Sequence, residues 1–228
     1  YGGTYRMIAP LVLEPQDSGV SEGPTVYAAA ENQRPVLSGG QPIRSWKPGP
    51  DGLWIADVPE AAAGTWNFQQ LWIDGQRRTR ARTPNDGYFT IVGKAPPAAD
   101  AQGNSAARDR TAFFFRSGDV KPWPDQAEAN LVVFHSWETS RLRIAGVDSA
   151  QSLVTFTGGA AWPFENWGPK QRYYVENVRE ALDAPGEWWL DRKAGQLLYK
   201  PIPGEEMTKI NAVVPRLTQL VAVRGDAA

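Results

Sequence analysis

Short runs of apolar residues, separated by glycine, proline and Asx turns, make up most of this chain. Apolar and polar positions alternate within many of these runs, and helical spacing is almost absent. The pattern therefore predicts an all-β protein. The predicted strands include Thr4–Met7, Leu11–Leu13, Thr25–Ala28, Pro35–Ser38, Leu53–Val58, Ala112–Phe115, Leu131–Trp137, Leu142–Ala145, Leu153–Thr157, Ala212–Val214 and Leu217–Val223.

Two tight hairpins are predicted by local turn chemistry. The first surrounds Asp74-Gly75, a pair preferred in two-residue primed turns, and joins Gln70–Ile73 to the strand that begins at Gln76. The second joins Trp188–Leu190 to Gln196–Tyr199. Its turn contains an aspartate opener and a glycine that can take a positive φ.

Two segments depart from the strand pattern. Val175–Leu182 has helical spacing of its aliphatic residues and stops at Pro185-Gly186, which predicts a short helix. Ala95–Arg108 is rich in alanine, proline and small polar residues, which predicts a long exposed loop.

The organisation of the domains follows from where hairpin signals occur. The first four predicted strands and the last two lack tight turns, as do coils of a parallel β-helix, in which each strand stacks on the next turn. Hairpin signals begin after Trp46. We therefore expect the start of a right-handed parallel β-helix with an inserted antiparallel β domain. The expected units are residues 1–40 as the first coil or coils, 41–205 as the insert with a hairpin at 187–200, and 206–228 as a return to coil.

Composition removes several classes of function. The chain has no cysteine, which excludes disulfides and cysteine-based sites. Its net charge of -1 gives no broad basic field for a phosphate backbone, so we expect no nucleic acid partner. No apolar run approaches the roughly 20 residues that span a bilayer, so we expect no membrane partner. Phosphate-loop and EF-hand spacings are also missing, and we expect no cofactor and no metal.

Tryptophan is unusually frequent, with ten residues in a chain that is polar on average. Trp46, Trp54, Trp66 and Trp72 lie in strand-like alternations and are expected to pack in the core or across strands. Trp123, Trp162 and Trp167 lie beside proline or glycine, where exposed platforms for sugar rings are expected.

A basic stripe follows the first hairpin, comprising Arg77, Arg78, Arg80 and Arg82. A solvated strand face is the usual role of such a stripe. The alternative is a clamp for an anionic sugar such as a uronate, since guanidinium groups pair bidentately with carboxylates.

The sequence around the single histidine offers the best local candidates for sugar contacts. On the strand Leu131–Trp137, alternation places His135 and Trp137 on the same side. A histidine on an apolar face is most often a hydrogen-bonded structural residue, and this one has no partner for a serine triad or a metal site. The predicted substrate-binding residues are His135, Trp137, Glu138, Arg141 and Trp167.

Glycoside hydrolysis needs two carboxylates facing each other across the sugar, at a distance that sequence does not give. Aromatic neighbours can raise a carboxyl pKa by desolvation, which draws attention to Glu138 and Glu165. No pair is assigned, and the catalytic residues stay unknown. The available acids are Glu138, Asp148, Glu165, Glu176, Glu187 and Asp191.

Several blocks occur in an order that resembles a known family. They include PVLSGG, QLWIDGQRRTRARTPNDGYF, VVFHSWETSRLRI and DAPGEWWLDRKAGQLLYKPIPGE. Together they look like the N-terminal part of bacterial right-handed parallel β-helix proteins related to glycoside hydrolase family 141. The resemblance implies an exported enzyme of polysaccharide breakdown, whose acidic catalytic residues lie on later coils beyond Ala228. The chain is then expected to be a fragment.

The favoured hypothesis is a non-catalytic, N-terminal portion of a secreted β-helix glycoside hydrolase that caps the helix and walls the glycan cleft. An autonomous carbohydrate-binding module is the main alternative, and a complete small glycosidase or polysaccharide lyase is the third. The expected partner is a polysaccharide or oligosaccharide, and the expected location is secreted, periplasmic or at the cell surface. Exposed β-helix ends are open sheet edges, so self-association is also expected.

Overall fold

The computed structural model describes residues 1–99 and 105–225, and this part of the chain consists almost entirely of strands and their connections. Within it, the α-helical residues form the single turn α1 (Pro59–Ala62). Four short 3-10 turns lie at Pro15–Asp17, Pro50–Gly52, Gln126–Glu128 and Arg179–Ala181. The prediction of an all-β protein is confirmed.

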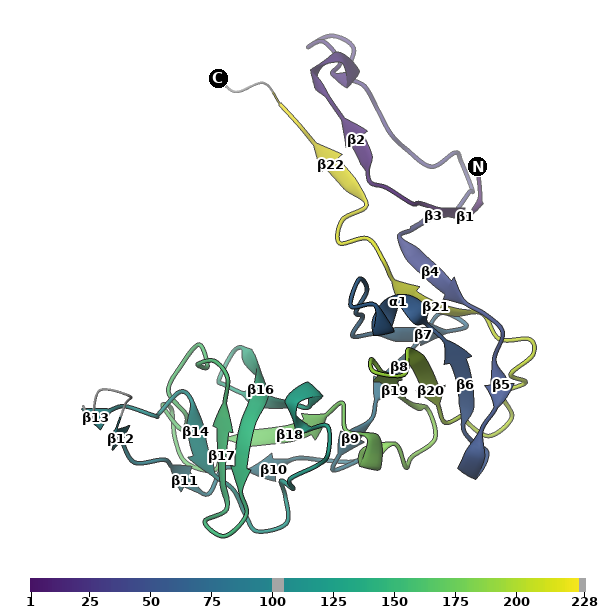
Figure 1. Ribbon diagram of the computed structural model, residues 1–228. Coiled ribbons are helices and arrows are strands. Elements are labelled where there is room, and N and C mark those ends of the chain that lie inside the picture. The colour runs from purple at the N-terminus through teal and green to yellow at the C-terminus, as the bar shows by residue number, and fades with distance from the viewer. Residues whose placement is uncertain (100–104, 226–228) are drawn as a thin grey trace.

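An eight-stranded sheet, the first sheet, occupies the centre of the molecule (Figure 1). Its strand order is β4-β21-β7-β8-β19-β20-β6-β5. Neighbouring strands are antiparallel except β8 and β19, which are parallel. The strands are β4 (Gly40–Ile43), β5 (Lys47–Pro48), β6 (Trp54–Asp57), β7 (Leu71–Ile73), β8 (Gln76–Arg80), β19 (Glu187–Asp191), β20 (Gln196–Tyr199) and β21 (Ala212–Pro215).

Both predicted hairpins are confirmed in this sheet. β7 and β8 meet at Asp74 and Gly75, which have φ values of 51° and 76°. Two positive φ values define the primed turn that the Asp-Gly pair predicts, and glycine takes the second one without steric cost. β19 pairs with β20 in the register Trp188↔Tyr199, and both of these rings are fully buried.

A second eight-stranded sheet lies beside the first and is antiparallel throughout its described strands (Figure 1). Its order is β10-β18-β15-β16-β17-β14-β11, and β9 also pairs with β18. The long strand β16 pairs with β15 along its first half and with β17 along its second half. A bulge between Ile144 and Gly146 bends β16 there, and this bend curls the sheet. The strands are β9 (Arg82–Thr83), β10 (Phe89–Thr90), β11 (Gly93–Lys94), β14 (Ala112–Phe114), β15 (Asn130–Phe134), β16 (Thr139–Asp148), β17 (Leu153–Phe156) and β18 (Arg172–Glu176).

Two parallel pairs extend away from the sheets (Figure 1). β1 (Gly3–Arg6) pairs with β3 (Pro35–Ser38), and β2 (Leu11–Leu13) pairs with β22 (Val221–Val223). These parallel ladders join the first sheet at Gly40, where a Cβ atom would collide with the side chain of Val213. The predicted strand Thr25–Ala28 is wrong, because these residues lie in an exposed loop.

Three further predictions need correction. Residues 175 and 176 end strand β18, because Tyr173 and Val175 alternate into the core, and only a 3-10 turn follows. Ala212–Val214 lies in the first sheet, where β21 pairs antiparallel with β4 and β7, rather than in a coil. The predicted loop Ala95–Arg108 contains a small hairpin of β12 (Ala98–Ala99) and β13 (Ser105–Ala106), while residues 100–104 lie outside the described residues. The domain boundaries at 40 and 205 stay a prediction.

A candidate glycan-binding surface

Three exposed tryptophans gather where strands of the second sheet end. Trp137 lies in the turn between β15 and β16, and Trp162 and Trp167 lie in the connection between β17 and β18. Their exposed fractions are 67%, 37% and 42%. Ring centroids are 4.6 Å apart for Trp137 and Trp167, 5.1 Å for Trp162 and Trp167, and 6.2 Å for Trp137 and Trp162. We call these three residues the tryptophan platform.

Exposed aromatic clusters of this kind are rare unless they bind something, because burying such large rings is favourable. Each indole offers a flat apolar face and an N–H donor. The apolar faces suit the C–H faces of a sugar ring, and the donors suit its hydroxyl groups. The platform is therefore the strongest glycan-binding candidate on the described surface.

A buried chain of hydrogen bonds holds the two platform loops together. Gln171 Oε1 accepts from the backbone N–H of Glu165 at 2.9 Å, so the amide nitrogen of Gln171 faces His135 and donates to Nδ1 at 2.9 Å. His135 Nε2 then carries the proton and donates to Ser140 Oγ at 2.9 Å. Ser140 Oγ also accepts from the backbone N–H of Ala161 at 3.2 Å. The histidine thus positions the platform loops.

The protonation of His135 gives a direct test of this network. Burial lowers the pKa of the imidazole below its ordinary 6.5, and nearby Glu138 opposes the shift. The unfolded state therefore binds a proton more readily, and stability should fall as the pH drops below about 6.5. Long-range ¹H–¹⁵N NMR of this single histidine should show a neutral Nε2–H tautomer at pH 7. A titration midpoint above 6.5, or an Nδ1–H tautomer, would contradict the network.

A small polar hollow of ≈ 270 Å³ lies next to the platform. Its lining includes Phe134, His135, Glu165, Trp167 and Arg172. Glu138 follows Trp137 in the turn, and its Oε1 is buried without a hydrogen-bond partner among the described residues. Polar groups therefore border the tryptophan platform on the side of His135.

Four of the five predicted substrate-binding residues lie together: His135, Trp137, Glu138 and Trp167. Arg141 does not join them. Ser140 points into the core, so the next residue emerges from the other side of β16. There Arg141 Nε lies 3.1 Å from Glu176 Oε1, and Nη1 donates to Gln69 Oε1 at 2.6 Å.

The tryptophan predictions are mixed. Trp162 and Trp167 are exposed as predicted, while Trp123 is only 8% exposed and packs in the core of the second sheet. Trp66 is buried as predicted. Trp72 on β7 is 38% exposed and is not part of the tryptophan platform. Proximity to proline or glycine indicates a loop, and a loop residue can still point inward.

The arginine stripe is a solvated strand face only in part, since Arg77 is exposed but its neighbours along the stripe are not. The side chains of Arg78 and Arg80 are each only 8% exposed, and both form ion pairs. Arg78 Nη2 donates to Glu205 Oε1 at 2.6 Å and its Nε donates to the Tyr199 hydroxyl at 3.0 Å. The Tyr199 hydroxyl donates in turn to Glu205 Oε2 at 2.6 Å. This closed triangle links β8, β20 and the segment before β21.

Five of the six candidate acids have structural partners, and among them Glu165 Oε1 accepts from the backbone N–H of Lys170 at 2.8 Å. Asp148 and Asp191 accept backbone N–H groups within their own turns. Glu187 accepts from the backbone N–H groups of Arg82, Asp183 and Ala184, and Glu176 pairs with arginines. These contacts assign the five carboxylates to turns, loop anchoring and ion pairs.

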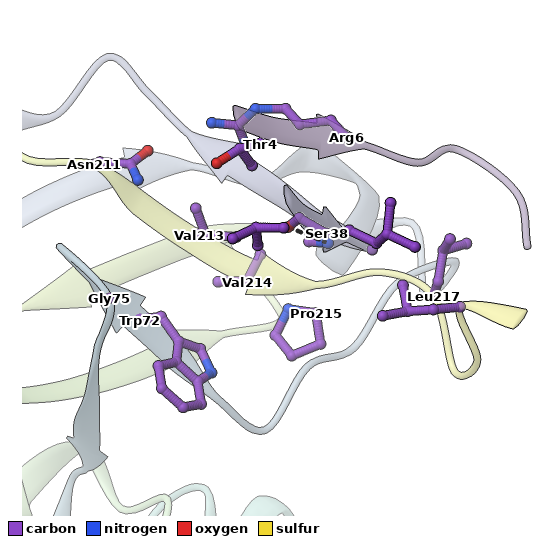
Figure 2. Close-up of a pocket in the computed structure, with 15 residues that line it drawn as sticks. Thr4, Arg6, Ser38, Trp72, Gly75, Asn211, Val213, Val214, Pro215 and Leu217 are labelled. Carbon is purple, nitrogen blue, oxygen red and sulfur yellow. Dashed lines mark hydrogen bonds between the residues drawn. The ribbon is translucent and has the colours of Figure 1, made fainter. Parts of the chain in front are cut away.

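A hollow of ≈ 670 Å³ lies where the parallel ladders meet the first sheet (Figure 2). Val213, Val214 and Leu217 line it together with Trp72, and Thr4 and Arg6 of β1 border it. The lining is mainly apolar, so this hollow suits packing better than sugar binding.

The described residues contain no group of three or more histidine, cysteine, aspartate or glutamate side chains that could hold a metal ion. The same residues contain no helix long and apolar enough to cross a membrane.

Comparisons with known proteins agree with a carbohydrate-related origin. A family model described as "GH141 insertion domain" matches residues 51–202, about two thirds of the chain. A solved structure titled "Glycoside hydrolase" is similar, with a TM-score of 0.76 and 28% sequence identity. The match covers 99% of this chain and 39% of that chain, so the sequence spans well under half of that protein. A comparison with curated proteins gave no match.

Proposed function

Because the chain belongs to the GH141 insertion-domain family, we propose that it is a non-catalytic, glycan-binding part of a larger glycoside hydrolase. The tryptophan platform carries this proposal. It presents three exposed indoles within 6.2 Å of one another, and the His135 network fixes the loops that bear them. The two sheets form the rigid support, and the platform forms one wall of the glycan cleft.

The parallel ladders support a second element of the proposal, a right-handed parallel β-helix that this region caps. β1–β3 and β2–β22 pair in parallel between segments far apart in sequence, as rungs of such a helix do. Their side chains include exposed Leu37 and Val223, and the apolar hollow of Figure 2 lies at their base. Further rungs stacked on these strands would cover both. We also propose export, because the polymeric substrate of such an enzyme lies outside the cell.

An autonomous carbohydrate-binding module is the second candidate. It is favoured by the two hydrophobic cores, one under each sheet, which the described residues complete among themselves. Both candidates bind glycans without cleaving them. They differ in whether this region strengthens the activity of a longer hydrolase. Measuring the activity of that hydrolase with and without this region would distinguish them.

Substitution of the platform tests glycan binding. We expect Trp137→Ala and Trp167→Ala each to weaken binding to a glycan selected from a polysaccharide panel by about tenfold, because central aromatic residues dominate such interfaces. Affinity gels or calorimetry would measure the change. Trp72→Ala is a matched control. Trp72 is exposed to a similar degree as Trp167, 38% against 42%, but it lies on the first sheet.

Three results would count against the proposal. Unchanged affinity in the platform variants would remove the platform from binding, and equal losses in the Trp72 variant would show a general effect of tryptophan loss. Cleavage of a glycan by the 228-residue chain itself would refute the non-catalytic role.

A further inference from the structure

A cleft rich in arginine lies between the first and second sheets, away from the tryptophan platform. Its volume is ≈ 300 Å³, at the lower end for small-molecule sites. It receives residues from β8, β9, β16 and β18, and Gln69 also lines it. We call it the arginine cleft, defined by Arg80, Arg82, Arg141, Tyr174 and Glu176.

The charges in the arginine cleft are not balanced. Arg80 Nη1 and Arg141 Nε both face Glu176 Oε1, at 3.5 Å and 3.1 Å. One carboxylate therefore serves two guanidinium groups. The side chains of Arg80 and Glu176 are only 8% and 7% exposed, and a buried charge is costly unless it is paired. Burial lowers the pKa of Arg80, Glu176 opposes this shift, and the positive charge of Arg141 adds to it.

Arg80 also keeps an unused donor. Its Nε is buried and has no hydrogen-bond partner among residues 1–99 and 105–225. A carboxylate offers two oxygens, so it can accept hydrogen bonds from a guanidinium in a bidentate geometry. Glu176 is the one carboxylate among the residues that define the cleft, against Arg80, Arg82 and Arg141, so an excess of positive charge is left for a carboxylate ligand to offset.

Aromatic side chains extend from the cleft along the outer face of the second sheet. Arg82 stacks over the Tyr174 ring at 4.1 Å and is held by the carbonyl oxygens of Pro84 and Gly87. Tyr88 lies 6.5 Å from Tyr174, and its exposed ring continues this surface. The surface therefore offers flat rings beside the cationic cleft, as a charged sugar residue requires.

We propose that the arginine cleft binds the carboxylate of a uronic-acid residue in an acidic glycan. Arg80 and Arg141 contact the carboxylate, and the exposed ring of Tyr88 supports the sugar ring. This inference rests on the proposed glycan-binding function and adds a second contact point that selects for acidic chains.

The test compares one oligosaccharide in two forms. Oligogalacturonate and its carboxyl-reduced, neutral counterpart would be titrated into the 228-residue chain by calorimetry at low ionic strength. We expect the acidic form to bind about tenfold more tightly, because each charge-assisted contact is strong when partly buried. Arg141→Gln should remove most of this preference, since it takes away one of the two guanidinium groups that contact the carboxylate and lowers the positive charge of the cleft. Arg141→Lys should retain part of it.

Arg143→Gln is the matched control. Arg143 lies two residues further along β16, is 47% exposed where Arg141 is 39% exposed, and lies near Glu128 rather than in the cleft. Its variant should keep the preference for the acidic form.

Each other outcome would overturn the inference. Equal affinity of the wild-type chain for both forms would reject the carboxylate site while leaving glycan binding intact. Equal losses in the Arg141 and Arg143 variants would indicate a general charge effect. Failure to bind either form, with neutral glycans from the panel still bound at the platform, would reject the arginine cleft alone. Failure to bind any glycan would reject the proposed function as well.

Discussion

Replacement of Glu205 by alanine is expected to lower the free energy of unfolding by about 3–5 kcal/mol, the usual result of removing one partner of a buried ion pair. Arg78 and Glu205 have side chains only 8% and 12% exposed, and the Tyr199 hydroxyl bonds to both. Loss of the carboxylate would leave the guanidinium and the phenol without their common acceptor. Urea unfolding at pH 7 would measure the effect.

Glu206→Ala is the control for this variant. Glu206 is adjacent in sequence but 65% exposed, and it pairs with Lys209 on the surface, where an ion pair contributes about 1 kcal/mol or less. Comparable losses in the two variants would contradict the role assigned to the buried triangle.

The same pair predicts a dependence on pH. Burial tends to raise the pKa of Glu205, but hydrogen bonds from Tyr199, Ile202 and Arg78 outweigh it and hold the pKa below the ordinary 4.5. A depressed carboxyl pKa stabilises the fold above the unfolded value and loses this effect as the pH falls through the folded value. The difference in stability between the wild type and Glu205→Ala should therefore shrink below about pH 4.5.

Phe113→Ala should cost about 3–5 kcal/mol, as is usual when a large aromatic side chain is removed from a core. Phe113 is fully buried in the second sheet, with ring centroids 5.0 Å from Phe164, 5.1 Å from Tyr173 and 5.5 Å from Phe156. Alanine would leave a cavity that three rigid rings fill poorly. Thermal unfolding followed by near-UV circular dichroism would report the loss of aromatic packing.

Phe114→Ala provides the comparison at the next position of β14. Its ring lies on the opposite face, half-buried against Ala95, Ala112 and Leu153. A smaller loss is expected here, because less apolar area leaves water on folding. If Phe114→Ala were as damaging as Phe113→Ala, the second sheet would not have its main core where the structure places it.

Local chemistry accounts for the parts of the fold that were predictable. The turns at Asp74-Gly75 and before Gly195 depend on residues next to one another in sequence, and both hairpins form as predicted. The parallel contact of β8 with β19 joins residues more than 100 positions apart, and no local pattern specifies it. Residues 175–182 were predicted as a helix, but they form the end of β18 and a 3-10 turn. A short run of spaced aliphatic residues fits a helix and a strand equally well until the pairing partners are known.

The candidate site was predictable to a similar degree. Trp137, Glu138 and His135 are neighbours in sequence, and residues beside proline or glycine pointed to Trp167 and Trp162. The partner of His135 was not identifiable, because Gln171 lies 36 residues away and only folding brings it to the ring. Arg141 lies on the other side of β16 because strand alternation, which separates it from Ser140, outweighs proximity in sequence. Its role in substrate binding stays a prediction.

The pairing of β2 with β22 affects how the region between these strands can change in evolution. Leu11–Leu13 and Val221–Val223 run side by side, so the chain departs and returns at adjacent points. Everything between them can be lengthened, trimmed or exchanged for another lobe without altering the spacing of the strands that hold it. The loops of the two sheets, including those that carry the tryptophan platform, can therefore change while the pairing of β2 with β22 keeps its register.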